Sequence, residues 1–190
     1  IVTPSFIANE AKNIVRKNKK VKIKIFNLKD AKKMGMNAFY SVAKGSDEPA
    51  KFIVCEYMAG GKEKPIVLIG KGITFDSGGI SLKPQATALS KIEDMKYDMS
   101  GAACMLSLLK IISELNIKMN LVVIIPATEN MPSGKSYKPG DIIKTFLGKT
   151  VEVISTDAEG RLILADAIAK INLPSASVEI TSTVFPKNVF

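Results

Sequence analysis

The sequence predicts an α/β protein, an α/β/α sandwich in which helices cover both faces of a mixed, mostly parallel central sheet. Helical and strand-like segments alternate along the 190 residues, the order typical of this class. Residues 66–69 and 121–127 are apolar almost throughout, as in strands buried on both faces. With 46% hydrophobic and 24% charged residues, the composition is that of one globular domain with a substantial core.

The first elements follow from local periodicity. Residues 4–18 predict an amphipathic helix, since their apolar side chains recur at nearly helical spacing. Residues 21–26 alternate apolar and basic side chains, which predicts a strand with one solvated face. A short helix is expected over 28–35, with Asn27 as its N-cap.

Two strands and a long helix are expected next. Residues 51–58 are strand-like, and residues 65–75 predict a second strand that runs directly into Asp76. Residues 98–116 have the spacing of a helix, and a strand is expected over 119–126.

The remaining elements begin after a loop at 127–140. Two strands near 141–146 and 150–155 are joined by a turn at Gly148, and a helix is expected over 160–171. Residues 178–184 predict a weak final strand.

Some residue types are missing, and their absence excludes whole classes of chemistry. The chain contains no histidine, which excludes Ser–His–Asp and Cys–His catalysis and every histidine-based zinc site. Cys55 and Cys104 stand singly in apolar surroundings, which indicates reduced thiols and a cytoplasmic protein. No segment approaches the roughly 20 apolar residues of a membrane span, so no membrane partner is expected.

Positive charge is concentrated near the N-terminus. Residues 1–33 carry ten basic and two acidic side chains, against a net charge of +9 for the chain. Such a segment can bind nucleic acid or an acidic partner. We favour a solvated helix face and a strand edge protected by lysines, because the row of aromatic side chains of a base-stacking platform is missing.

Four carboxylates follow predicted strands or stand beside glycine-rich turns: Asp76, Asp98, Asp157 and Glu159. Ligands of open α/β sheets collect at the carboxyl ends of the strands, so these side chains are expected to converge there. Their mutual repulsion would need cations to neutralise it. Without histidine, the set favours Mg²⁺, Mn²⁺ or Zn²⁺, and a bridging Asp76 suits a two-metal arrangement.

Each of these residues also has a structural explanation when taken alone. Lys71 and Lys83 could be ordinary surface or loop lysines, and Asp157 with Arg161 could form an ion pair at a helix start. Residues 133–136 (SGKS) suggest a phosphate-binding loop, but the required upstream glycine is replaced by Glu129, so we reject that interpretation.

Four segments in fixed order carry a resemblance to a known family. They are GKGITFDSGGISLKP from residue 70, MKYDMSGAA from 95, ENMPSGKSYKPGD from 129 and STDAEGRLILADA from 155. They resemble the leucyl aminopeptidase family, cytosolic aminopeptidases with two metal ions, and the similarity covers about residues 35–172. The family usually has Asn where Ser155 stands.

The resemblance implies a set of metal ligands. Lys71, Asp76, Asp98 and Glu159 match the ligands of one metal ion, and Asp76, Asp157 and Glu159 match those of the other. The implied cofactors are two divalent ions, Mn²⁺ or Zn²⁺ with Mg²⁺ as an alternative. A lysine amine coordinates a metal only after losing its proton, which a nearby dication favours.

The resemblance also implies a reaction. A hydroxide that bridges the two metals would attack the first peptide bond of peptides with leucine-like N-terminal residues. Lys83 matches the lysine that polarises the peptide carbonyl, and Arg161 matches the arginine that binds a bicarbonate serving as proton shuttle. The implied partners are a peptide substrate and further copies of the chain, since the family forms hexamers.

The chain departs from the family in two ways. The interval from Lys83 to Asp98 is a few residues longer than usual, which makes Asp94 a weaker rival of Asp98. Family members carry an N-terminal domain and continue well past the last of these segments, so we expect residues 1–190 to form a catalytic domain that lacks the N-terminal domain and the C-terminal part of the catalytic domain. Two alternatives to an active aminopeptidase therefore stay open: a truncated, inactive metal-binding or interaction module, and, less favoured, a nucleic-acid-binding protein acting through residues 12–33.

Overall fold

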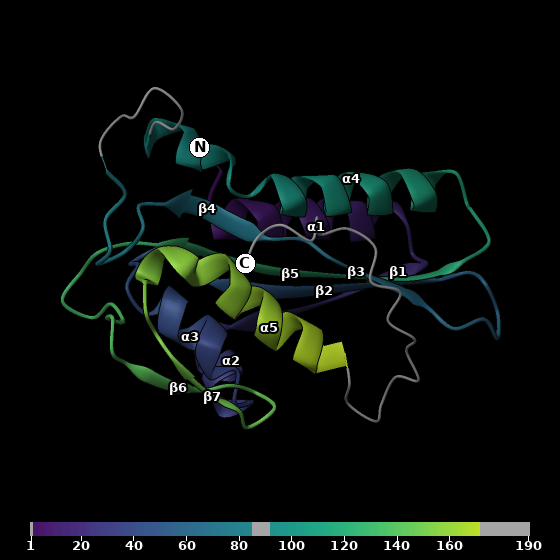
Figure 1. Cartoon of the computed structure of the whole chain (residues 1–190). Helices are drawn as coiled ribbons and strands as arrows, with labels where there is room; N and C mark the ends of the chain where they lie inside the picture. Colours follow the sequence, from purple (N-terminus) through teal and green to yellow (C-terminus); the bar gives the residue numbers. More distant parts are fainter. Residues whose placement is uncertain (1, 85–91, 172–190) are drawn as a thin grey trace.

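The computed structural model describes residues 2–84 and 92–171, and its elements are arranged in three layers (Figure 1). The middle layer is a mixed sheet. Its strands are β1 (Val21–Asn27), β2 (Lys51–Met58), β3 (Ile66–Ile69), β4 (Gly72–Asp76) and β5 (Asn120–Asn130). The order across the sheet is β1-β2-β5-β3, and β4 also pairs with β5. β1 and β2 are antiparallel, as are β2 and β5, whereas β3 and β4 run parallel to β5.

Two helices cover one face of this sheet: α1 (Pro4–Lys17) and α4 (Ser100–Glu114). Their buried side chains share one apolar cluster with alternate residues of β2 and β5, among them Ile53, Tyr57 and Val123. α1 begins where the sequence predicts, because the Thr3 hydroxyl accepts a hydrogen bond from Phe6 N at 3.1 Å.

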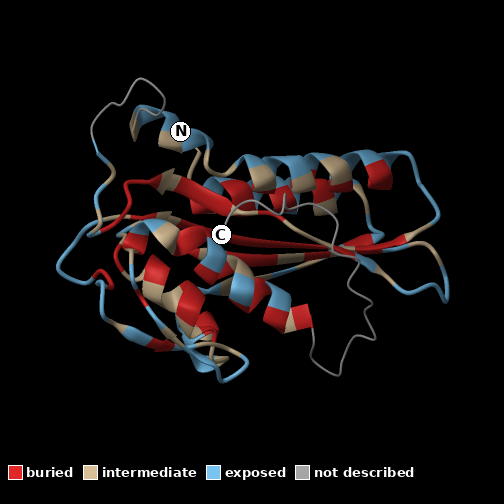
Figure 2. Cartoon of the chain, in the orientation of Figure 1, coloured by how far each residue is buried: buried red, intermediate tan, exposed pale blue. Residues whose placement is uncertain are grey.

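The other face is covered by α2 (Leu28–Lys33), α3 (Asn37–Ala43) and α5 (Glu159–Ile171). A second apolar cluster joins α3 and α5 to the sheet and to the hairpin of β6 (Ile142–Lys144) and β7 (Thr150–Glu152). Figure 2 shows the burial concentrated in the sheet and on the helix faces turned toward it. The α/β/α sandwich with a mixed sheet is therefore confirmed.

One predicted strand is wrong in an informative way. The strand expected over 65–75 is broken into β3 and β4 at Gly70 and Lys71. A Cβ atom on Gly70 would lie 2.6 Å from Gly101 O, so only glycine allows α4 to approach this closely. Lys71 O then accepts a hydrogen bond from Ala102 N at 2.9 Å. This backbone carbonyl thus bonds to α4 instead of a neighbouring strand, and the strand is interrupted at Lys71.

The other boundaries differ mainly in length. Asn27 caps α2 through a reciprocal pair of hydrogen bonds with Asp30, as expected. β5 continues to Asn130, four residues beyond the predicted end. The short helix α3 and the 3₁₀ turns η1 (Ile92–Tyr97) and η2 (Thr156–Ala158) were not predicted. The strand expected at 178–184 lies outside the described residues.

Within the part of the chain that the structure describes, no helix is both long and apolar enough to cross a membrane.

Candidate metal centre

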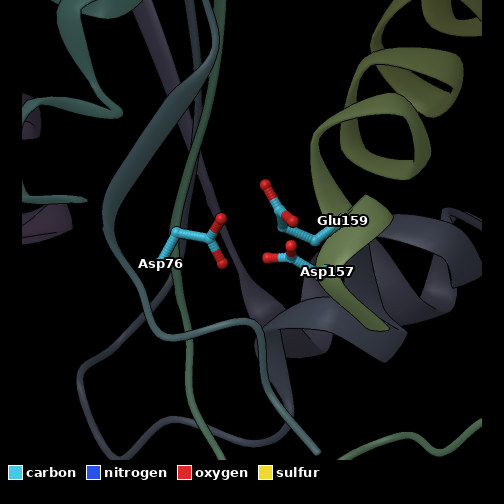
Figure 3. Close-up of side chains that lie close together, drawn as sticks. All are labelled: Asp76, Asp157 and Glu159. Atoms are coloured by element: carbon cyan, nitrogen blue, oxygen red, sulfur yellow. The ribbon is translucent and has the colours of Figure 1, made fainter. Parts of the chain in front are cut away.

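The site begins with three carboxylates that converge from two distant segments. Asp76 is the last residue of β4, Asp157 lies in η2, and Glu159 is the first residue of α5. One oxygen atom of each lies within 4.8 Å of the others, a spacing that a divalent ion could bridge. Figure 3 shows the Asp76 carboxylate facing those of Asp157 and Glu159 from the opposite side of the site. The expected convergence of these three carboxylates is present. Only Asp76 follows a strand of the central sheet, however, because β7, which precedes Asp157, belongs to the separate β6-β7 hairpin.

Lys71 and Asp98 adjoin this group. Lys71 Nζ lies 2.7 Å from Asp98 Oδ2 and 2.9 Å from Glu159 Oε1. The lysine reaches Glu159 by passing over Gly160, where a Cβ atom would lie 2.8 Å from both Lys71 Cε and Nζ. The glycine after Glu159 therefore leaves the space that the lysine occupies.

Lys83 lies on the other side of Asp76. Its Nζ atom is 3.0 Å from Asp76 Oδ2 and 2.5 Å from Asp157 Oδ1. Burial lowers the pKa of Lys83, but hydrogen bonds to Asp157 and Asp76 outweigh it, and the pKa is raised overall. Lys83 is therefore a protonated hydrogen-bond donor at neutral pH.

Among the described residues, no ion pair or hydrogen bond joins the Arg161 side chain to these groups. Its side chain is exposed, and it forms no ion pair with any residue that the structure describes. Asp94, the rival of Asp98, is exposed on η1, whereas Asp98 is half-buried against Lys71. Of the two aspartates, Asp98 is therefore the one that contacts Lys71.

Burial makes this concentration of charge costly. It raises the pKa of Glu159 and of Asp98, and the nearby Asp76 carboxylate raises both further, although Lys71 opposes the shift. For Lys71, burial lowers the pKa, but Glu159 and Asp98 outweigh it and raise the pKa overall. Four carboxylates and two ammonium groups leave an excess of negative charge in a partly desolvated site.

The donor set fits divalent cations. Glu159 is 1% exposed, and its Oε2 atom is buried without a hydrogen-bond partner among the described residues. A buried carboxylate oxygen without a donor is unfavourable unless a cation binds it. The residues that could hold an ion are Asp76, Asp157 and Glu159, with Lys71 and Asp98 beside them.

Sequence reasoning assigned no role to three buried polar residues behind the carboxylates. Asn130 Nδ2 donates to Asp76 Oδ1 at 2.8 Å, and Thr156 and Tyr137 are hydrogen-bonded in the same network. All three belong to segments that carry the family resemblance, which was the only available signal. Their contacts could not be inferred, because they join segments far apart in the sequence.

Comparisons with known proteins all indicate one family. The model of the cytosol aminopeptidase family, catalytic domain, matches residues 1–183. A probable cytosol aminopeptidase of Herminiimonas arsenicoxydans is 47% identical over 185 residues, which is 96% of this chain and 36% of the relative. One of Methylibium petroleiphilum is 50% identical over 167 residues, covering 87% of this chain and 34% of the relative.

A solved structure is also similar. The leucine aminopeptidase of Caenorhabditis elegans matches with a TM-score of 0.81 and 35% sequence identity, over 88% of this chain and 33% of that chain. The chain thus spans about a third of the length of the relatives it matches.

Proposed function

This chain belongs to the cytosol aminopeptidase family, and on that premise we propose that its acidic cluster is a two-metal centre for aminopeptidase chemistry. The reaction would be hydrolysis of the N-terminal peptide bond of a peptide. The observation that carries the proposal is the convergence of Asp76, Asp157 and Glu159 within 4.8 Å. Beside it, Oε2 of Glu159 has no hydrogen-bond partner among the described residues.

The proposed division of ligands follows the family resemblance. Lys71, Asp76, Asp98 and Glu159 would hold one divalent ion, and Asp76, Asp157 and Glu159 the other. The contacts of Lys71 with Asp98 and Glu159 support the first set, because they bring all three side chains to one place. When bound, the two ions would activate a water molecule and polarise the scissile carbonyl.

Lys83 has the position and the protonation state to stabilise negative charge on the substrate. Its ammonium group borders Asp76 and Asp157, and its raised pKa keeps the proton in place. A fixed cationic donor beside the reacting carbonyl would stabilise the negative charge that develops on its oxygen. Lys83 would therefore act as an oxyanion-stabilising residue.

The finer expectations rest on the resemblance. They are the preference for leucine-like N-terminal residues, Mn²⁺ or Zn²⁺ as the metal, bicarbonate at Arg161, a homo-oligomer and a cytoplasmic location. For Arg161 the position is compatible with a bicarbonate site beside the centre, since the residue lies two positions after Glu159 and its side chain is exposed.

The test is hydrolysis of leucyl-p-nitroanilide by the purified chain with Mn²⁺, before and after chelation. Glu159→Gln should abolish turnover, because it removes a buried ligand charge while keeping the side chain's shape. Asp94→Asn is the matched control, since Asp94 is exposed. Turnover that survives complete chelation would refute the proposal. Binding of two ions without turnover would instead support the truncated metal-binding or interaction module.

A further inference from the structure

Two buried side chains lie between the segments that carry the proposed ligands. Asn130 is the last residue of β5 and is 1% exposed, and Thr156 in η2 is fully buried. One of the two segments ends β4 with Asp76, and the other leads through η2 into α5. The segments are separated by about 80 residues of sequence, so only tertiary contacts can fix their relative position.

The Asn130 amide group joins the two segments directly. Its Nδ2 atom donates one hydrogen bond to Asp76 Oδ1 at 2.8 Å and another to Thr156 O at 2.9 Å. A side-chain amide nitrogen carries two protons, so both are used. A single planar group thus connects a proposed ligand with the backbone of the opposite segment.

The Thr156 hydroxyl adds a second connection. Its Oγ1 atom donates to Gly78 O at 2.6 Å and accepts from Ser81 N at 2.8 Å. Ser81 Oγ in turn accepts a hydrogen bond from Thr156 N at 3.2 Å. The loop after Asp76 is therefore fastened to the residue that directly precedes Asp157.

Tyr137 also belongs to this hydrogen-bond network, through the backbone carbonyl of Thr156. Its hydroxyl donates to Thr156 O at 2.7 Å, so this carbonyl accepts from both Tyr137 and Asn130. Burial raises the pKa of Tyr137, and the nearby carboxylates raise it further. The phenol therefore stays protonated and can donate this hydrogen bond.

These contacts also orient the Asp76 carboxylate. Its Oδ1 atom accepts from Asn130 Nδ2 and, at 3.0 Å, from Gly78 N. Its Oδ2 atom is the one that faces Lys83. The carboxylate therefore cannot rotate without losing two hydrogen bonds to Oδ1.

We propose that Asn130 and Thr156 are positioning residues that hold Asp76 in register with Asp157 and Glu159, so that the ligands are arranged before a metal ion binds. This inference rests on the proposed function, because it assigns these three carboxylates as metal ligands. Residues that orient metal ligands through hydrogen bonds typically change metal affinity about 10- to 100-fold when they are removed.

A purely structural role is the competing explanation, and the same strand offers a matched control. Asn120, the first residue of β5, is 5% exposed and also links a neighbouring loop. Its Oδ1 atom accepts from Gly60 N at 2.9 Å, and its Nδ2 atom donates to Glu63 O at 2.6 Å and Gly61 O at 3.2 Å. Asn120 is thus a buried bridging asparagine at the opposite end of the strand from the site.

The experiment compares Asn130→Ala with Asn120→Ala by calorimetric titration of the metal-free proteins with Mn²⁺. Both variants should lose stability, but only Asn130→Ala should bind Mn²⁺ about 10- to 100-fold more weakly. Hydrogen exchange without metal should accelerate in residues 76–83 and 155–159 of Asn130→Ala and stay unchanged there in Asn120→Ala. Wild-type Mn²⁺ affinity in Asn130→Ala would overturn the inference, as would equal losses of affinity in the two variants.

Thr156 provides the second pair, in case Asn130→Ala does not fold. Thr156→Val loses the hydroxyl and should weaken Mn²⁺ binding, whereas Thr156→Ser keeps the hydroxyl and should restore it. Equal affinity in both variants would contradict the positioning role. The proposed function fails separately, if the wild-type chain binds Mn²⁺ but releases no p-nitroaniline. A wild-type chain that binds no Mn²⁺ would overturn both.

Discussion

Gly160→Ala is a sharp test of the site, because activity should fall while the stability of the fold stays nearly unchanged. Gly160 is the second residue of α5, where an alanine would by helix propensity add up to about 1 kcal/mol of stability. The new Cβ atom, however, would lie 2.8 Å from Lys71 Cε and Nζ. The end of the Lys71 side chain must move until it lies at least 3.4 Å from the new Cβ atom, a shift of about 0.6 Å.

A shift of this size should change the free energy of unfolding little but the activity of the site strongly. The end of a lysine side chain is flexible, so we expect the free energy of unfolding to stay within about 1 kcal/mol of wild type. Functional groups need their positions held within about 0.5 Å, and a displacement of about 1 Å can cost about 100-fold in rate. The contacts of Lys71 with Asp98 at 2.7 Å and Glu159 at 2.9 Å would be lost or lengthened.

The assay is kcat/KM for leucyl-p-nitroanilide at saturating Mn²⁺, together with urea denaturation of the metal-free protein. Gly160→Ala should lower kcat/KM by about 10- to 100-fold without unfolding the chain. Gly134→Ala is the control, since a Cβ atom there would meet no described residue within 4 Å apart from its own chain neighbours. Wild-type kcat/KM in Gly160→Ala would refute the assignment of Lys71 to the metal centre.

Three further predictions concern Asp98 and the two cysteines. Asp98→Asn should lower kcat/KM by at least about 100-fold, because Asp98 contacts Lys71. Asp94→Asn should leave kcat/KM unchanged. If Asp94→Asn lowers kcat/KM more than Asp98→Asn does, the ligand is Asp94. Iodoacetamide at pH 8 should modify native Cys104, which is exposed, but not Cys55, whose pKa burial raises to about 12; mass spectrometry that finds Cys55 alkylated in the folded chain would contradict this. In the unfolded chain the Cys55 thiol ionises at about pH 8.5, whereas in the folded chain it stays protonated to a higher pH. Its contribution to the free energy of unfolding should therefore be full below that pH and fall as the pH rises toward 12. A stability difference between wild type and Cys55→Ala that is constant from pH 7 to 10 would exclude that effect.

The sequence was sufficient to predict the layers of the fold and the convergence of Asp76, Asp157 and Glu159. Residues 66–69 and 121–127 are apolar throughout because both faces of the strands are covered, and this pattern is visible without a structure. The expectation that Asp76 and Asp157 meet followed from the rule that ligands collect at the carboxyl ends of parallel strands. Both inferences depend on local patterns plus one general rule of topology.

The break between β3 and β4 could not be predicted in the same way. It arises because Gly70 meets the backbone of Gly101, a contact between segments about 30 residues apart. The strand-forming residues at 66–69 and 73–75 led to the prediction of one strand, although Gly70, Lys71 and Gly72 are residue types that strands disfavour. The interruption nevertheless matters, since it occurs at the residue that contacts Asp98 and Glu159.

The network behind the ligands was hidden for a related reason. Asn130 and Thr156 are common turn and cap residues, and nothing in their immediate sequence distinguishes a metal-site support from an ordinary loop contact. Their role depends on which partners they meet after folding. Arg161 illustrates the converse, because its motif predicts a role at the site while its exposed side chain forms no ion pair with any described residue.

The most direct test of the central claim is a crystal structure of the chain soaked with Mn²⁺, with anomalous scattering used to locate the metal. The proposal predicts two anomalous peaks, one contacted by Lys71, Asp98 and Glu159 and the other by Asp157 and Glu159, with Asp76 contacting both. The absence of peaks among these side chains at saturating Mn²⁺ would contradict the two-metal centre.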